Sequence, residues 1–527
     1  MRQLQFEGEI TEAARYALRY ASDFYDVKEA KDFDSLFQIN SRDFLNKCYE
    51  GYKISQDIIV RNILSIENEL KVKQKELTNF KKGKHHKELY RDPVYKRLVE
   101  NETQLRIQRA AFHEVANSIV WTVLLQERTH VKSFIQPGGG SGYLRDRNID
   151  SVIAVAKNHN ENPNKFTLIC DITSCLHVGD LLTVGNGKLT ITEVKDKGQV
   201  NDLVSEIIHG SLKKMSVNID AIKKLKLVSP KHGFKQVERN FNQLRNFFST
   251  KEYIQTDETF DSYFQEYRKA ITIFTEDKNY SDLVETGLDE LYKSDKSYLI
   301  LPSDCCIIGL FKRKEDESGF VRRMDFRHHL YHWTKEPYEK CQYLDPHKAK
   351  FSKEDPPEFV KYHELPIHSF KEKIFVPTHP PIFFVLKEKY AVDLLIDKID
   401  IYIYFDYQRF FEMCKERGLN PRWLSVSDLA KGENKNSTSY LPDFDGKYLE
   451  IADTSNKSKS TFGYGLLYRI LFEFQWGYNV IDQFKEQLWI DSHPIWNEIR
   501  TRVRLKIRYL RLKWYIYKKY VLSYIRS

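Results

Sequence analysis

The sequence predicts an α/β protein in which a mixed sheet is flanked by helices, with a long helical hairpin before this core and an α+β domain after it. Three patterns carry the prediction. Apolar residues recur every three or four positions over much of residues 59–126, as in packed helices. Short β-prone runs and glycine-rich turns follow in residues 166–194, and strand and helix patterns mix again after residue 257. A chain of 527 residues is too long for one ordinary core, so two or three domains are expected.

Composition narrows the class of protein. The aromatic fraction of 14% supplies bulk for large cores, and the formal net charge of +9 permits a polyanionic partner. Seven cysteines at irregular spacing form neither a disulfide framework nor a Cys-x-x-Cys zinc site, so a reducing compartment is expected. The N-terminal residues lack the apolar stretch of a signal peptide, and no run is apolar enough to span a bilayer. We therefore expect a cytoplasmic protein without membrane contact.

The first predicted element is a long amphipathic helix over residues 59–80. Its apolar stripe consists of Ile59, Ile63, Ile66, Leu70, Leu77 and Phe80. The basic segment Lys81–His86 (KKGKHH) forms a loop, and residues 104–126 form a second helix. The two helices together make a hairpin, whose role is structural, dimer-forming or contact with nucleic acid.

The second helix carries an acid in an unusual place. Its apolar stripe consists of Leu105, Phe112, Val115 and Ile119. Glu114 lies off this stripe, on a line of mostly small and apolar residues spaced three or four apart, which are Ile107, Ala110, Ser118 and Trp121. A carboxylate among such neighbours needs a partner or a metal ion. The alternative is a charge on the helix surface that merely sits near Trp121.

A β-hairpin is predicted over residues 179–195, GDLLTVGNGKLTITEVK. The β-prone residues 181–184 and 189–194 flank Gly-Asn-Gly-Lys, whose members accept the positive φ angles of a tight turn. Asp180 opens the first strand and Glu193 closes the second. Antiparallel pairing therefore brings both carboxylates to one end of the sheet.

Lys195 completes this constellation. It follows Glu193 by two residues and projects from the same face, because side chains alternate along a strand. Two carboxylates and a nearby ammonium group suit Mg²⁺ and a phosphate. The order Asp180, then Glu193-Val194-Lys195, resembles the PD-(D/E)XK nuclease superfamily. The leading Pro-Asp of that motif is replaced here by Gly179-Asp180.

The resemblance implies a restriction-endonuclease-like core and a set of catalytic roles. Asp180 and Glu193 would hold Mg²⁺ or Mn²⁺, and Lys195 would position or polarise the attacking water. Family members commonly carry a glutamate on the helix before the core sheet, which Glu114 matches. Many also carry a glutamine on the helix after Glu-x-Lys; Gln236 is our assignment, with Gln243 as the other choice.

The strand before the hairpin is predicted at Phe166–Asp171 (FTLICD), an apolar run that reads as a buried neighbour of the hairpin. Asp171 either acts as an outer acid of the site or caps the following turn through Thr173, and we favour the cap. With these elements the expected regions are a helical N-terminal part (1–92), a nuclease-like core (93–260), an accessory α+β domain (261–430) and a C-terminal helical basic region (431–527).

The basic region contains a helix whose apolar stripe runs from Ile499 to Tyr524 and is surrounded by cations. Arg504, Arg508 and Arg511 are the cations that we expect to contact a phosphate backbone. A packed terminal helix with a basic solvent face, or a helix docked on a membrane surface, are the alternatives. The histidines of residues 328–332 lack the spacing of a zinc site.

These features predict a metal-dependent nuclease, with DNA as its partner and Mg²⁺ or Mn²⁺ as its cofactor. No Walker motif is present, so an ATPase or sensor would be a separate protein. A nuclease with a large accessory domain suits restriction or anti-phage defence, an inference by analogy. The alternatives are a non-cleaving nucleic-acid-binding protein on a nuclease-like scaffold and a helical-hairpin assembly protein, which would form a homo-oligomer.

Overall fold

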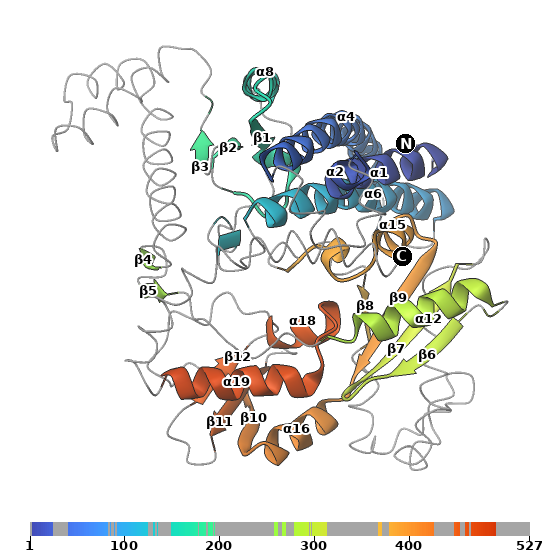
Figure 1. Cartoon of the computed structure of the whole chain (residues 1–527). Coiled ribbons are helices and arrows are strands. Elements are labelled where there is room, and N and C mark those ends of the chain that lie inside the picture. The colour runs from blue at the N-terminus through green and yellow to red at the C-terminus, as the bar shows by residue number, and fades with distance from the viewer. Residues whose placement is uncertain are drawn as a thin grey trace, which may run out of the picture. The chain divides into compact units, whose positions relative to one another are not determined.

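The chain consists of two compact units, one within residues 1–270 and the other within residues 271–509. The computed structural model describes residues 3–24, 41–82, 85, 89, 92–124, 130–131, 134, 149–177, 179–185, 188–192, 194, 258–261, 266–269, 279–294, 296, 298–313, 367–370, 379–425, 447–453, 459–462 and 465–491. Both units combine helices with small antiparallel sheets, so the predicted mixed α/β class is confirmed (Figure 1). Within the described ranges, no helix has both the length and the apolar composition of a bilayer span.

The first unit is built on a pair of long helices. Its helices are α1 (Gln3–Leu18), α2 (Tyr20–Phe24), α4 (Ser41–Lys81), α6 (Pro93–Val123) and α8 (Ile149–Asn160). α4 and α6 form the expected hairpin, and each begins earlier than the apolar periodicity suggested. α6 starts at Pro93 because the Asp92 carboxylate accepts a hydrogen bond of 2.9 Å from the backbone N–H of Val94, while proline suits the first helical position.

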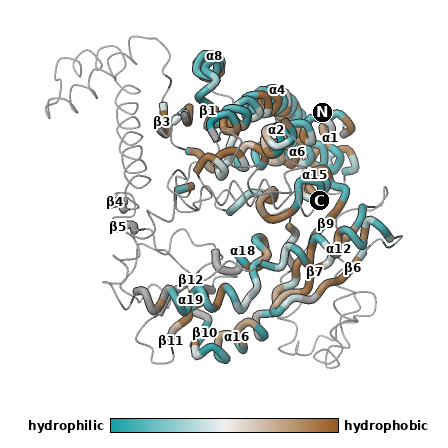
Figure 2. The backbone as a smooth tube through the Cα atoms, viewed as in Figure 1, coloured by the Kyte–Doolittle hydropathy of each residue, from teal (hydrophilic) through white to brown (hydrophobic). Residues whose placement is uncertain are grey.

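α1 packs against this pair and completes a three-helix core. The Phe6 ring meets the Phe112 ring edge to face, with centroids 5.8 Å apart. The Ser55 hydroxyl of α4 donates to the Ala13 carbonyl of α1 at 2.9 Å, which satisfies a buried polar group. α4 and α6 are further joined by the Arg109–Glu67 ion pair, 2.5 Å between Nη1 and Oε1. Figure 2 shows the alternation of hydrophilic and hydrophobic residues along α4 that lets one face pack in this way.

A three-stranded antiparallel sheet in the order β1-β2-β3 follows the helices. Its elements are β1 (Lys165–Ile169), the 3-10 turn η2 (Cys170–Ile172), β2 (Leu181–Gly185) and β3 (Lys188–Thr192). The predicted hairpin and its buried neighbouring strand are therefore confirmed, with Leu181 opposite both Ile169 and Thr192. Each strand pair among the described residues is antiparallel, whereas a mixed sheet was expected. Residues 195–257, which would continue such a core, lie outside the described residues.

The outer edge of β1 is bonded to side-chain amides instead of another strand. The Gln56 amide of α4 donates to the Thr167 carbonyl at 3.1 Å and accepts from the Ile169 N–H at 2.9 Å. At the end of α8, Asn160 accepts from the Thr167 N–H at 2.7 Å and donates to the Thr167 carbonyl at 3.0 Å. These bonds anchor the sheet to the helical core. The first unit also contains the separate strand pair β4 (Glu258–Asp261) and β5 (Glu266–Lys269).

The second unit contains a four-stranded antiparallel sheet in the order β6-β7-β9-β8. Its members are β6 (Tyr298–Pro302), β7 (Cys306–Lys312), β8 (Ile367–Ser369) and β9 (Ile399–Phe405). β6, β7 and β9 are largely hydrophobic (Figure 2), and nearly every residue of β9 is buried. The helix α12 (Ser281–Lys293) crosses the face of β6 and β7 (Figure 1). Gly287 permits this close approach, because a Cβ there would meet Leu301 Cδ1 at 2.6 Å.

A second sheet of this unit, in the order β10-β11-β12, lies partly in residues expected to be helical. The remaining elements are η5 (Ile382–Phe384), α15 (Glu388–Leu395), α16 (Tyr407–Glu416), β10 (Leu419–Ser425), β11 (Lys447–Asp453), β12 (Lys459–Phe462), α18 (Gly465–Phe472) and α19 (Gly477–Asp491). β11 contains Leu449 and Ile451, which lie on one side of the strand and are buried, and its residues Glu450 and Ala452 are buried as well. Residues 431–527 are thus not helical throughout.

Candidate functional site

Asp180 lies at the end of the β1-β2-β3 sheet and joins the two outer strands to β2. Its backbone N–H donates to the Thr192 carbonyl at 2.9 Å, and its carbonyl accepts from the Cys170 N–H at 2.9 Å. These bonds extend the strand pairing one residue beyond β2. The end of β1, the start of β2 and the end of β3 therefore meet at Asp180.

The Asp180 carboxylate closes the end of the hairpin. One of its oxygens accepts a hydrogen bond of 2.6 Å from the backbone N–H of Val194. Thr192 and Val194, the two neighbours of Glu193 in sequence, are thus both bonded to Asp180. A carboxylate has about four acceptor positions, so this bond does not exhaust its capacity. Glu193 and Lys195 themselves lie outside the described residues.

Position 179 has a backbone conformation that glycine adopts and proline does not. Its φ angle is +77°, whereas the ring of proline holds φ near −65°. A side chain at this position would also collide with Ile191 Cγ2 and approach the Thr192 carbonyl at 3.3 Å. The chain therefore enters Asp180 by a turn that requires glycine.

We expect Gly179→Ala to destabilise the hairpin by about 2 kcal/mol or more, since it combines left-handed strain with a steric clash. Protection factors of the β2 and β3 amides in hydrogen exchange measure this loss. Gly8→Ala is the matched control, because Gly8 lies within α1 and a methyl group added to it would meet nothing within 4 Å. Alanine there should leave protection unchanged or raise it, as alanine favours helices. Equal effects of the two substitutions would contradict the assigned backbone conformation.

Glu114 is buried in α6, with 4% of its surface exposed, so the alternative of a charge on the helix surface does not hold. The two residues that bracket it on the helix bind the segment after β1. His113 Nδ1 lies 2.7 Å from the Ile172 carbonyl oxygen. The Asn117 amide donates to the Ser174 hydroxyl at 2.7 Å and accepts from the Ser174 N–H at 3.0 Å. These contacts join α6, on either side of Glu114 in the sequence, to the segment that follows β1.

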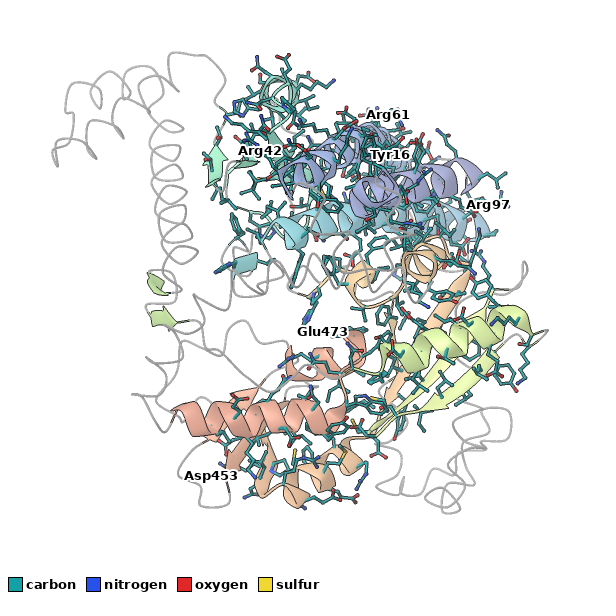
Figure 3. All side chains as sticks on the ribbon, in the orientation of Figure 1. Tyr16, Arg42, Arg61, Arg97, Asp453 and Glu473 are labelled. Atoms are coloured by element: carbon teal, nitrogen blue, oxygen red, sulfur yellow. The ribbon has the colours of Figure 1, made fainter. Side chains whose placement is uncertain are left out.

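The same segment leads from β1 toward Asp180 along the chain. Cys170, bonded to Asp180, precedes Ile172 by two residues, and Ile172 contacts His113 on α6. Burial raises the pKa of the nearby Cys175 thiol, and the negative charge of Glu114 adds to that rise. The charge of Glu114 therefore acts on the segment between β1 and β2. Figure 3 shows the side chains of the helical core, with Arg61 on α4 and Arg97 near the start of α6 labelled.

Burial lowers the pKa of His113 to about 4, because the charged imidazolium would lose its hydration. An unfolded histidine has a pKa of about 6.5. Between these two pH values the unfolded chain binds a proton that the folded chain does not, so folding stability falls as pH decreases through that window. The loss attributable to His113 is about 2 kcal/mol between pH 7 and pH 5.

We therefore expect His113→Gln to remove most of this acid sensitivity from α6. The measurement is the change in protection factors of the α6 amides between pH 7 and pH 5, corrected for intrinsic exchange. His159→Gln provides the control, since His159 lies on α8 and is only partly buried. Identical pH dependence in wild type and His113→Gln would show that His113 does not govern it.

The other predicted site residues lie outside the described residues. They are Gln236, Gln243, Arg504, Arg508 and Arg511. Glu102, a second acid of α6, accepts bonds from Arg106 at 2.6 Å and from Gln74 at 3.4 Å. It therefore belongs to the surface between α4 and α6.

Sequence patterns did not identify His113 and Asn117 as neighbours of the site. Their signal is a pair of polar residues, four positions apart, in a stretch of helix that, apart from Glu114, contains only apolar or small residues. The Thr173 hydroxyl stabilises the turn after β1, since it donates to the Cys170 carbonyl at 2.7 Å and accepts from the Leu176 N–H at 3.1 Å. That turn precedes Asp180 and presents Ser174 to Asn117. The expected cap by Asp171 stays a prediction.

The chemistry of the donors suits a hard cation. Asp180 and Glu114 both offer carboxylate oxygens, the ligands that Mg²⁺ and Mn²⁺ prefer. Among the described residues, no group of three or more His, Cys, Asp or Glu side chains is arranged to hold a metal ion. A third acid for this site would come from Glu193, next to Val194. No known protein family, curated protein or solved structure matches this chain.

Proposed function

We propose that the chain is a metal-dependent nuclease that hydrolyses phosphodiester bonds of DNA, with a restriction-endonuclease-like core in residues 93–260. The arrangement of Asp180 and Glu114 supports this most. Asp180 closes a β-hairpin at the sheet end, and Glu114 is buried in α6, whose residues His113 and Asn117 are bonded to the segment between β1 and Asp180. In the proposed site, these two carboxylates from distant parts of the chain would supply part of the acidic ligand set.

The roles of the residues follow from their chemistry. Asp180 and Glu193 would hold Mg²⁺ or Mn²⁺, which when bound supplies Lewis-acid stabilisation of charge on the phosphate. Glu114 assists a second ion or orients the attacking water through its carboxylate. Lys195 places a positive charge beside the phosphate and polarises that water. Gln236 organises the site.

The proposal also covers how the DNA substrate is bound and in which biological process the enzyme acts. Arg504, Arg508 and Arg511 would contact the phosphate backbone, since cations that neutralise phosphates release bound counterions. The setting that suits such an enzyme is restriction or anti-phage defence in the bacterial cytoplasm.

The direct test incubates the purified full chain with supercoiled plasmid, linear duplex and single-stranded DNA. Each substrate is offered with Mg²⁺, with Mn²⁺ and with a chelator. We expect nicking or cleavage that requires a divalent ion. Binding of DNA without cleavage of any substrate would instead support the alternative function, a non-cleaving nucleic-acid-binding protein.

A further inference from the structure

One side of the C-terminal part of α4 carries three lysines with no acid among them. Lys71 and Lys75 lie within α4, and Lys82 directly follows its last residue. Intervals of four and seven residues place the three on the same side of a helix. All three are exposed, as is Thr78 between them. We call Lys71, Lys75 and Lys82 the lysine face.

Among the residues that the structure describes, no acid is paired with the lysine face. Glu76 is the one acid in the sequence of residues 71–82, and it is bonded to Lys73 at 2.9 Å on another side of the helix. No carboxylate among the described residues forms an ion pair with Lys71, Lys75 or Lys82. By contrast, Arg61 and Arg109, closer to α1, are each paired with a glutamate at 2.7 Å and 2.5 Å.

Two further cations extend this charge across the hairpin. Lys96 and Arg97 are exposed on the first turns of α6, and no described acid pairs with them. The antiparallel packing brings them beside the end of α4, since the ring of Tyr95 stacks on that of Phe80 with centroids 6.2 Å apart. Figure 3 shows Arg97 at the opposite end of the helical core from Arg42. The cations therefore gather at one end of the hairpin.

We propose that the lysine face, with Lys96 and Arg97, binds the phosphate backbone of duplex DNA. The spacing fits this partner. At 1.5 Å per residue the lysine face spans about 16 Å, over which one strand of a duplex carries roughly five phosphates. Flexible lysines without bidentate geometry suit a contact with the backbone and not with base edges. This binding surface is separate from the residues proposed for cleavage.

The test compares DNA binding by two triple variants of the full chain. Lys71→Gln, Lys75→Gln and Lys82→Gln together remove the lysine face. Lys157→Gln, Lys293→Gln and Lys415→Gln together remove the same charge from lysines on three separate helices. Fluorescence anisotropy with a labelled duplex of about 30 base pairs, in chelator and over about 50–200 mM salt, gives the affinity and its salt dependence.

We expect the lysine-face variant to bind at least about tenfold more weakly at low salt. The slope of log affinity against log salt should fall by roughly 0.9 for each lost phosphate contact. The scattered variant should keep the wild-type slope. Equal slopes in both variants, or stronger binding of wild type to anionic vesicles or polyglutamate than to DNA, would overturn the proposal. Because the chelator prevents cleavage, absence of nuclease activity does not affect this result.

Discussion

Asp180→Asn should reduce DNA cleavage by about a thousandfold or more while leaving the hairpin folded. Asparagine keeps an oxygen that can accept the bond from the Val194 N–H, so the closure of the hairpin survives. It removes the negative charge that a divalent ion requires, and loss of one such electrostatic contribution costs a large part of the rate. Initial rates of plasmid nicking at saturating Mg²⁺ measure the effect.

Two comparisons make this result specific. Asp150→Asn removes a carboxylate from the exposed start of α8 and should leave the rate unchanged. Asp180→Ala removes both the charge and the acceptor of the Val194 bond, so it should also lower the protection of the β3 amides. A rate near wild type in Asp180→Asn would exclude Asp180 as a metal ligand, even if the wild-type chain proves to be a nuclease.

Glu67→Gln should destabilise the first unit by about 3–5 kcal/mol, because it leaves the Arg109 guanidinium buried without its counter-charge. The side chains of Glu67 and Arg109 are 3% and 13% exposed, and their charged atoms are 2.5 Å apart. Protection factors of the α4 and α6 amides in hydrogen exchange report the free energy of opening of this helix pair.

An exposed ion pair on α6 provides the control for Glu67→Gln. Glu102→Gln breaks the Arg106–Glu102 pair, in which the arginine side chain is 43% exposed, and should cost less than about 1 kcal/mol. The double variant Glu67→Leu with Arg109→Met should recover most of the loss, since apolar side chains carry no desolvation penalty. Equal losses in Glu67→Gln and Glu102→Gln would show that burial does not strengthen the first pair.

Local patterns were sufficient to predict the hairpin and its neighbouring strand. The turn glycines and β-prone residues of 179–195 act over short distances, so the sequence alone indicated the pairing of β2 with β3. The burial of Glu114 was also foreseeable, because its neighbours one turn away, Ala110 and Ser118, are small.

Other features depend on contacts that no local pattern encodes. Periodicity shows which face of α6 is apolar, but it does not reveal that Asn117 meets Ser174, 57 positions away. The positive φ of Gly179 and the packing of Ile191 beside it were not visible in the sequence, where position 179 appeared only as a departure from Pro-Asp. β11 was missed because its short apolar run, which includes Leu449 and Ile451, is flanked in the sequence by polar residues.

The side-chain amides of Gln56 and Asn160 cover one edge of the first sheet and thereby determine where another strand could pair with it. Free strand edges recruit further strands, including strands of other molecules, through their unpaired N–H and carbonyl groups. On β1 the N–H and carbonyl of Thr167 and the N–H of Ile169 are already bonded to these two side chains, so another strand cannot pair with that edge. Any strand that enlarges this sheet must therefore pair with β3, the other outer strand. Replacing Gln56 and Asn160 with leucine would open the β1 edge and expose the protein to edge-to-edge aggregation.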